Sequence, residues 1–180
     1  MKPYFLVIRN YIKLKLYKMF VCNNMTFDKI EMLSGQTKFK LQPNSNVKLG
    51  KHIITDGHST LVVSNGGELT IGNSVYFNEG CMISCKSKIE VGDNCKFGPG
   101  VMIFDNNHKY DANIGVSDVH TSSPIIIGKN CWIAANAIIL KGTIIEDNCV
   151  IGAGSIVSGH VQKGSIVTNS REMIIKKMEK

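Results

Sequence analysis

A histidine close to two acidic residues is the strongest candidate for chemistry in this chain of 180 residues. His108 follows Asp105 by three residues and precedes Asp111 by three. An imidazole changes its charge near neutral pH, and one oriented by a carboxylate or a backbone carbonyl can act as a general base. Such a base can take the proton of a sugar hydroxyl as that hydroxyl attacks an activated acyl group. The alternative is a surface histidine with no catalytic role.

Zinc binding by histidines is a second kind of chemistry to consider. A β-helix that holds zinc needs a close histidine pair and a third histidine on a neighbouring coil. His52 and His58 lie six residues apart, and His108 and His120 lie twelve apart, so neither pair has a suitable spacing. The cysteines Cys81 and Cys85 are not complemented by a second pair. We therefore expect no metal site.

A repeat of six residues runs from Ile127 to Gln162 and indicates the scaffold that holds these candidate residues. The first positions of the hexads are Ile127, Ile133, Ile139, Ile145, Ile151 and Val157, and the fifth positions are Cys131, Ala137, Thr143, Cys149, Ser155 and Val161. A period of six fits neither an amphipathic helix nor an alternating strand, and it is typical of a parallel β-helix. Three hexads form one triangular coil, with the first and fifth positions pointing inward.

The repeat extends towards the N-terminus and is interrupted once. Similar openings begin at Val47, Leu69 and Ile89, and the next one follows 36 residues later. That long interval predicts an excursion of residues 104–123 from an otherwise regular prism, and long loops on rigid scaffolds usually carry function. Beyond Ile127 we expect steps of 18 residues, to Ile145 and then Lys163.

These boundaries predict three parts: residues 1–46 as an N-terminal cap or extension, 47–168 as the β-helix, and 169–180 as a basic C-terminal tail. Residues 21–43 show no clear period and are expected to be irregular, with at most one short strand. Met1–Phe20 holds five basic residues and no acid, out of a net charge of +7. It is expected to cover the open end of the solenoid, to lie as a basic amphipathic helix on an anionic membrane, or both.

The rest of the composition bears on the partners and on the cellular compartment of the protein. The repeat region is nearly neutral, which argues against a nucleic-acid partner. Four of the six cysteines occupy fifth positions of hexads, where a free thiol serves as a small apolar group, so we expect reduced cysteines and a cytoplasmic protein. No stretch is apolar enough for a transmembrane span, and the N-terminus does not resemble a signal peptide.

Two motifs together resemble a known family. The segment Asn107-His108-Lys109-Tyr110-Asp111 is followed by Pro124-Ile125-Ile126-Ile127-Gly128-Lys129-Asn130-Cys131-Trp132-Ile133, and later by hexads ending at Val157. In these features the chain resembles the hexapeptide-repeat acyltransferases, above all the maltose and galactoside O-acetyltransferases and those of capsule and lipopolysaccharide sugars. The resemblance covers residues 47–177. It implies an all-β, left-handed parallel β-helix that forms a homotrimer with active sites between subunits.

The resemblance also implies roles for particular residues. His108 matches the catalytic base, Asn78 matches an acceptor-binding asparagine, and Asp105 is a further candidate for substrate binding. The positions expected to bind the acyl donor acetyl-CoA are Trp132, Ala135, Ala153, Ser158, Lys176 and Lys177. Among these, Trp132 would line the pantetheine path and the backbone N–H of Ala135 would polarise the thioester carbonyl.

The expected function is therefore acetyl-CoA-dependent O-acetylation of a sugar hydroxyl in capsule or lipopolysaccharide biosynthesis, in the cytoplasm or at the inner face of the membrane. One alternative is an N-acyltransferase acting on an amino sugar nucleotide, although no added nucleotide-binding domain is visible in the sequence. A non-catalytic β-helix scaffold is an alternative of another class.

Overall fold

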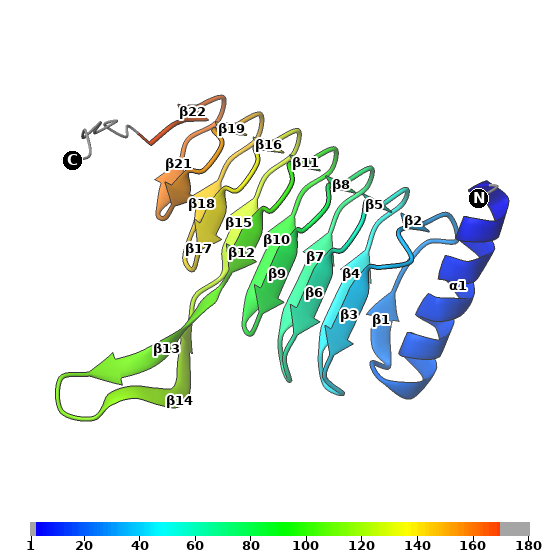
Figure 1. Ribbon diagram of the computed structural model, residues 1–180, viewed down its shortest axis with the longest axis horizontal. Helices are drawn as coiled ribbons and strands as arrows, with labels where there is room; N and C mark the ends of the chain where they lie inside the picture. The colour runs from blue at the N-terminus through cyan, green and yellow to red at the C-terminus, as the bar shows by residue number, and fades with distance from the viewer. Residues whose placement is uncertain (1–2, 170–180) are drawn as a thin grey trace, which may run out of the picture.

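Three parallel sheets form the sides of a triangular prism in the computed structural model, which describes residues 3–169 (Figure 1). The first sheet contains β1 (Asn24–Thr26), β4 (Asn46–Leu49), β7 (Glu68–Ile71), β10 (Lys88–Val91), β15 (Ile125–Ile127), β18 (Ile144–Ile145) and β21 (His160–Val161). The second contains β2 (Met32–Leu33), β5 (Ile54–Thr55), β8 (Tyr76–Phe77), β11 (Lys96–Phe97), β16 (Trp132–Ile133), β19 (Val150–Ile151) and β22 (Ile166–Val167). The third contains β3 (Lys38–Leu41), β6 (Thr60–Val63), β9 (Met82–Cys85), β12 (Met102–Phe104), β17 (Ile138–Leu140) and β20 (Ile156–Val157). This is the parallel β-helix predicted from the hexads, and the stacked coils fit its left-handed form.

The register of the coils agrees with the repeat over most of the chain. Val47 pairs with Leu69, Leu69 with Ile89 and Ile89 with Ile125, so the expected openings do stack on one another. The expected step from Ile145 to Lys163 is wrong, because Ile145 pairs with Val161. The corner between β20 and β21 is two residues shorter than a regular hexad allows.

The coil also begins earlier than the sequence predicts. Residues 21–43 are not irregular, because β1, β2 and β3 pair in parallel with β4, β5 and β6 and complete one further turn. Inward positions of this turn, such as Met25, Leu33 and Phe39, are buried. The sequence of this turn lacks the apolar opening followed by Gly that marks the later coils, so the turn is seen only through its pairing with the next one.

The interior of the prism is a continuous apolar column. Inward residues alternate with outward ones along each strand, and the rings of Phe77 and Phe97 stack at 4.6 Å between centroids. All six cysteines are free and buried. Burial raises the pKa of the Cys81 thiol to about 11 and that of Cys85 to about 12, so these thiols serve packing rather than nucleophilic chemistry.

Asparagines at successive corners allow the sharp bends between the first and second sheets. Asn94, Asn130 and Asn148 adopt φ of 60°, 56° and 62°, in the left-handed region that asparagine tolerates better than most residues. Each of their N–H groups donates to a carbonyl of the coil before it, at 2.8–2.9 Å. The corners therefore stack in register and hold the prism straight.

The helix α1 (Pro3–Phe20) covers the N-terminal end of the prism (Figure 1). Leu14 is buried against the first coil, and four other side chains of this face donate to its backbone carbonyls. The donors are Arg9 and Asn10 to Leu33, Asn10 to Glu31, Lys13 to Thr37 and Tyr17 to Phe39, at 2.7–3.2 Å. These side chains supply hydrogen bonds to carbonyls that a preceding coil would otherwise bond, as a cap at the open end of a solenoid would.

The excursion is a β-hairpin that projects from the side of the prism (Figure 1). Its strands are β13 (Asn106–Asp111) and β14 (Gly115–Ser122), and they pair antiparallel. The hairpin leaves after β12 and returns to β15, at the corner between the third and first sheets. The prism is therefore interrupted where the 36-residue interval predicted.

Candidate active site

The orientation of His108 on β13 suits a general base. Its Nδ1 lies 3.0 Å from the backbone oxygen of Ser117, across the hairpin. Because a carbonyl oxygen only accepts, the proton of the neutral ring must reside on Nδ1, which leaves the lone pair of Nε2 available. The His108 side chain is exposed, so this nitrogen is open to a substrate. The sequence left two kinds of orienting group open, a carboxylate and a backbone carbonyl, and the structure has the backbone carbonyl of Ser117.

Two further contacts within the hairpin surround His108. His120 is its cross-strand partner, and the two rings lie 4.1 Å apart between centroids. The pairing register of β13 with β14 shifts between His108 and Tyr110. At this irregularity the hydroxyl of Ser117 donates to the carbonyl of Lys109. Bulges commonly redirect a side chain beside a functional site. The sequence did not single out Ser117, because a hairpin register cannot be read without its turn.

The prediction that Asp105 binds substrate is wrong. Its side chain is fully buried, and its carboxylate accepts hydrogen bonds from the backbone N–H groups of Lys86 and Ser87 at 2.7–3.1 Å. The amide of Asn106 donates to the same carboxylate at 2.9 Å. Asp105 thus satisfies the donors of the corner one coil below and anchors the base of the hairpin, which leaves it no surface for a ligand.

A groove at another corner brings together three of the other predicted residues. It has a volume of about 310 Å³ and follows the corner between the second and third sheets. Its lining residues are Tyr76, Asn78, Lys96, Phe97, Gly98, Pro99, Trp132 and Ala135. Lys96 pairs with Tyr76 on one side and Trp132 on the other, so a cation lies between two aromatic side chains on the same outward face. Tyr76 and Lys96 were not predicted as site residues.

Ala135 offers the donor that an oxyanion needs. Among residues 3–169, no backbone hydrogen bond uses its N–H, although its carbonyl accepts from Gly154 at 2.8 Å. Gly98 lies directly below, where a Cβ would come within 2.6 Å of the Ala135 nitrogen. A glycine at that position keeps the N–H approachable. A fixed, unpaired N–H of this kind can stabilise negative charge on a thioester oxygen.

Among the other predicted positions, Ala153 continues along the edge of the groove, on the coil after Ala135. Ser158 follows β20 and lies at the corner between the third and first sheets, the corner at which the hairpin leaves the prism. Both side chains are exposed, as a contact with an extended cofactor arm requires. Lys176 and Lys177 lie outside the described residues.

A single chain does not bring His108 and the groove together. Asn78 and Ala135 precede strands of the third sheet, whereas His108 follows β12 of that sheet. The whole width of the sheet therefore separates the two corners.

Comparisons with known proteins agree with the fold and with the motifs. Residues 124–158 match the family described as hexapeptide repeat of succinyl-transferase. Galactoside O-acetyltransferase of Escherichia coli K12 is 36% identical over 95 residues, which are 53% of this chain and 47% of the relative. A protein of the same strain, WbbJ, is 25% identical over 146 residues, covering 76% of this chain and 74% of the relative. Its assignment as a lipopolysaccharide biosynthesis O-acetyl transferase is itself provisional.

Solved structures share the architecture. A maltose O-acetyltransferase from Clostridium difficile 630 superposes with a TM-score of 0.54 and 24% identity, over 97% of this chain and 89% of that one. AntD, an N-acyltransferase from Bacillus cereus, superposes with a TM-score of 0.64 and 15% identity, over 82% and 81%.

The chain is therefore a β-helix protein built on hexapeptide repeats. The resemblance to hexapeptide-repeat acyltransferases of the galactoside and maltose O-acetyltransferase type is confirmed. The matching region spans about half the length of galactoside O-acetyltransferase.

Proposed function

We propose that this protein is an acetyl-CoA-dependent O-acetyltransferase that modifies a sugar hydroxyl. The observation that carries the proposal is the hydrogen bond from His108 Nδ1 to the Ser117 carbonyl, which leaves Nε2 as a base on an exposed hairpin. The sequence similarity to O-acetyltransferases supports the same reaction. The groove with Trp132 and the unpaired N–H of Ala135 suits the acyl donor.

The reaction would proceed by direct transfer. Nε2 of His108 removes the proton of the acceptor hydroxyl while the oxygen attacks the thioester carbon and a C–O bond forms. The Ala135 N–H stabilises the resulting oxyanion. The C–S bond then breaks, and His108 returns the proton to the departing thiolate. The products are the sugar ester and the free thiol.

A homotrimer forms part of this proposal. The separation of His108 from the groove within one chain favours sites made by two neighbouring subunits. Mixed oligomers of the variants His108→Ala and Trp132→Ala test this arrangement. If the two residues act from different chains, some sites regain both native residues and activity returns on mixing. If both act from one chain, every site keeps a defect and activity stays low.

We further propose a surface polysaccharide as the acceptor and the cytoplasmic face of the membrane as the location. The similarity to a lipopolysaccharide O-acetyl transferase favours this acceptor class. The second candidate, N-acylation of an amino sugar nucleotide, is favoured by the fold similarity to AntD, whose structure contains dTDP-4-amino-4,6-dideoxyglucose. Matched hydroxyl and amino sugars, offered as acceptors, separate the two. No helix in residues 3–169 has both the length and the hydropathy to cross a bilayer.

The variant His108→Ala tests the mechanism directly. We expect turnover to fall about 10²- to 10⁴-fold, the usual contribution of a general base, while coenzyme A binding measured by calorimetry is retained. His160→Ala is the matched control, because His160 is exposed on β21 and its Nε2 contacts Glu146 at 2.8 Å rather than a residue of the hairpin or the groove. Near-native turnover of His108→Ala would refute the assignment.

A further inference from the structure

The side of α1 that faces away from the prism is unusually apolar. We define the outer face of α1 as Tyr4, Phe5, Ile8, Ile12, Leu16 and Met19, all of which are exposed. Ile8, Ile12 and Met19 are 60%, 53% and 61% exposed. Their spacing of three to four residues places them on one stripe of the helix. The opposite side carries Asn10, Leu14 and Tyr17, which hold the first coil.

A cap that served the prism alone would not need this stripe. Terminal elements of solenoids usually present a polar outer side, because that side remains in water. The inner side of α1 holds the first coil through Leu14 and through polar side chains, whereas the apolar side chains of the outer face stay exposed in the described part of the chain. Contiguous exposed apolar side chains of this kind mark a contact surface.

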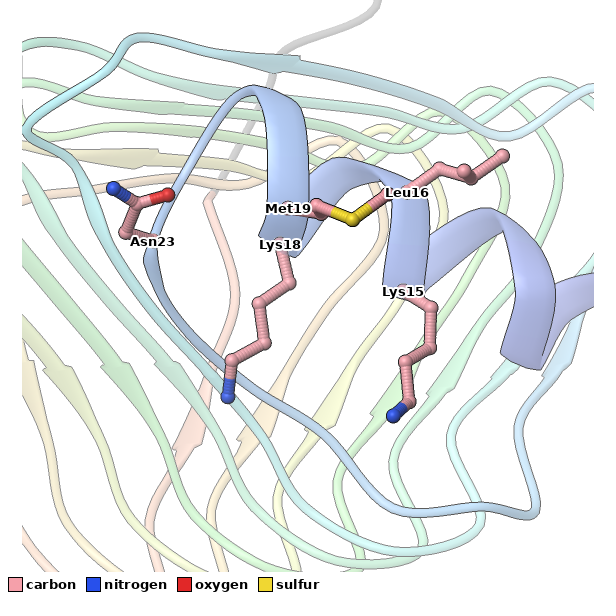
Figure 2. Close-up of a pocket in the computed structure, with 5 residues that line it drawn as sticks. All are labelled: Lys15, Leu16, Lys18, Met19 and Asn23. Carbon is pink, nitrogen blue, oxygen red and sulfur yellow. The ribbon is translucent and has the colours of Figure 1, made fainter.

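The charges beside the stripe show which partner fits. The helix contains no acidic residue. Lys15 and Lys18 lie beside Lys29 along one edge of the helix, where the three line a common hollow. Figure 2 shows Lys15 and Lys18 extending in the same direction from α1, while Leu16 and Met19 lie on another side of the helix. A hollow of about 460 Å³ lies between these lysines and apolar side chains.

We propose that the outer face of α1 docks on an anionic lipid bilayer. Ile8, Ile12 and Met19 would enter the boundary between headgroups and acyl chains, and the lysine edge would meet lipid phosphates. A second copy of the chain fits less well, since two such helices would oppose lysines without any acid on either. This proposal rests on the surface of α1 and not on the proposed acetyl transfer.

The proposed trimer would strengthen docking. Cyclic symmetry places the same end of every subunit on one side of the assembly, so three copies of the outer face would meet one membrane together. The long axis of the prism would then point away from the membrane surface, because α1 lies across the end of the stack of coils (Figure 1).

Vesicle sedimentation of the full-length protein tests the proposal. The probes are vesicles of phosphatidylcholine with and without phosphatidylglycerol. Two test variants, Ile8→Gln/Ile12→Gln and Lys15→Gln/Lys18→Gln, remove apolar contacts or charge from exposed positions. Their controls are Ile166→Gln, at an exposed isoleucine of β22, and Lys51→Gln/Lys163→Gln, which remove the same charge elsewhere. Circular dichroism confirms that each variant folds.

We expect the native protein to bind the anionic vesicles and not those of phosphatidylcholine alone. Loss of the two lysines should weaken binding about 30-fold, and loss of the two isoleucines at least about tenfold, whereas both controls should bind as the native protein does. The proposal is overturned if the native protein does not bind, or if the controls weaken as much as the test variants. It is also overturned if Ile8→Gln/Ile12→Gln halves the molar mass in solution, which would assign the surface to a second copy. A separate assay of acetyl transfer to a soluble sugar acceptor tests the proposed enzyme activity independently of membrane binding.

Discussion

Replacing Glu31 by glutamine should stabilise the folded protein at neutral pH. Glu31 is buried beneath α1, and its Oε2 accepts the N–H of Ile53 at 2.7 Å. Its Oε1 has no hydrogen-bond partner among residues 3–169. Burial, together with the nearby charge of Asp28, raises the pKa of Glu31 from 4.5 to about 8. The carboxyl group is therefore neutral in the folded protein at pH values where an exposed glutamate is ionised.

The raised pKa determines the direction and size of the effect. Between pH 4.5 and about 8 the folded state keeps a proton that the unfolded state has released. The contribution of Glu31 to stability is thus full below pH 4.5, declines as the pH rises, and is lost once the pH passes about 8. At about 1.4 kcal/mol per pH unit, the loss at pH 7 is about 3 kcal/mol. Glutamine has nearly the same shape as the protonated acid and can accept from Ile53, so Glu31→Gln should remove this loss.

Urea unfolding at a series of pH values, at constant protein concentration, measures the effect. The native protein should lose stability relative to Glu31→Gln as the pH rises from about 5 to about 8, and the two should converge at low pH. Glu68→Gln, the same change at an exposed position, should follow the native curve. A Glu31→Gln curve parallel to that of the native protein would show that the carboxyl is not protonated in the fold, and the reasoning would fail.

Two further predictions concern the hairpin anchor and the core thiols. Asp105→Asn should lower the free energy of unfolding by about 2 kcal/mol, because an amide cannot accept from Lys86, Ser87 and Asn106 together, whereas exposed Asp118→Asn should change it by less than about 0.5 kcal/mol. Equal losses in urea unfolding would contradict the anchoring role. The six buried cysteines should resist a thiol reagent in the native protein and all react in denaturant; rapid labelling of the native state would contradict their burial.

The sequence by itself determined the β-helix and the position of its interruption. Six successive hexads with Ile or Val at one phase can bury that phase only by stacking coils, so the fold follows from the period. The long interval between Ile89 and Ile125 located the hairpin by residue spacing alone, and these two residues do pair on adjacent coils. Local patterns of this kind are visible because each coil repeats the same contacts.

Only the tertiary structure decided how the candidate site is arranged. Asp105 and His108 stand three residues apart and were both expected to face the substrate, yet Asp105 is buried in a corner and His108 is exposed on a hairpin. The partner of His108 is the carbonyl of Ser117, which depends on the register of two strands and not on residue type. The first coil was likewise hidden, because it has no visible period and is defined by the pairing of its strands with those of the next coil. Residue spacing fixes which side of an element a side chain lies on, while burial and pairing depend on what the rest of the chain places against it.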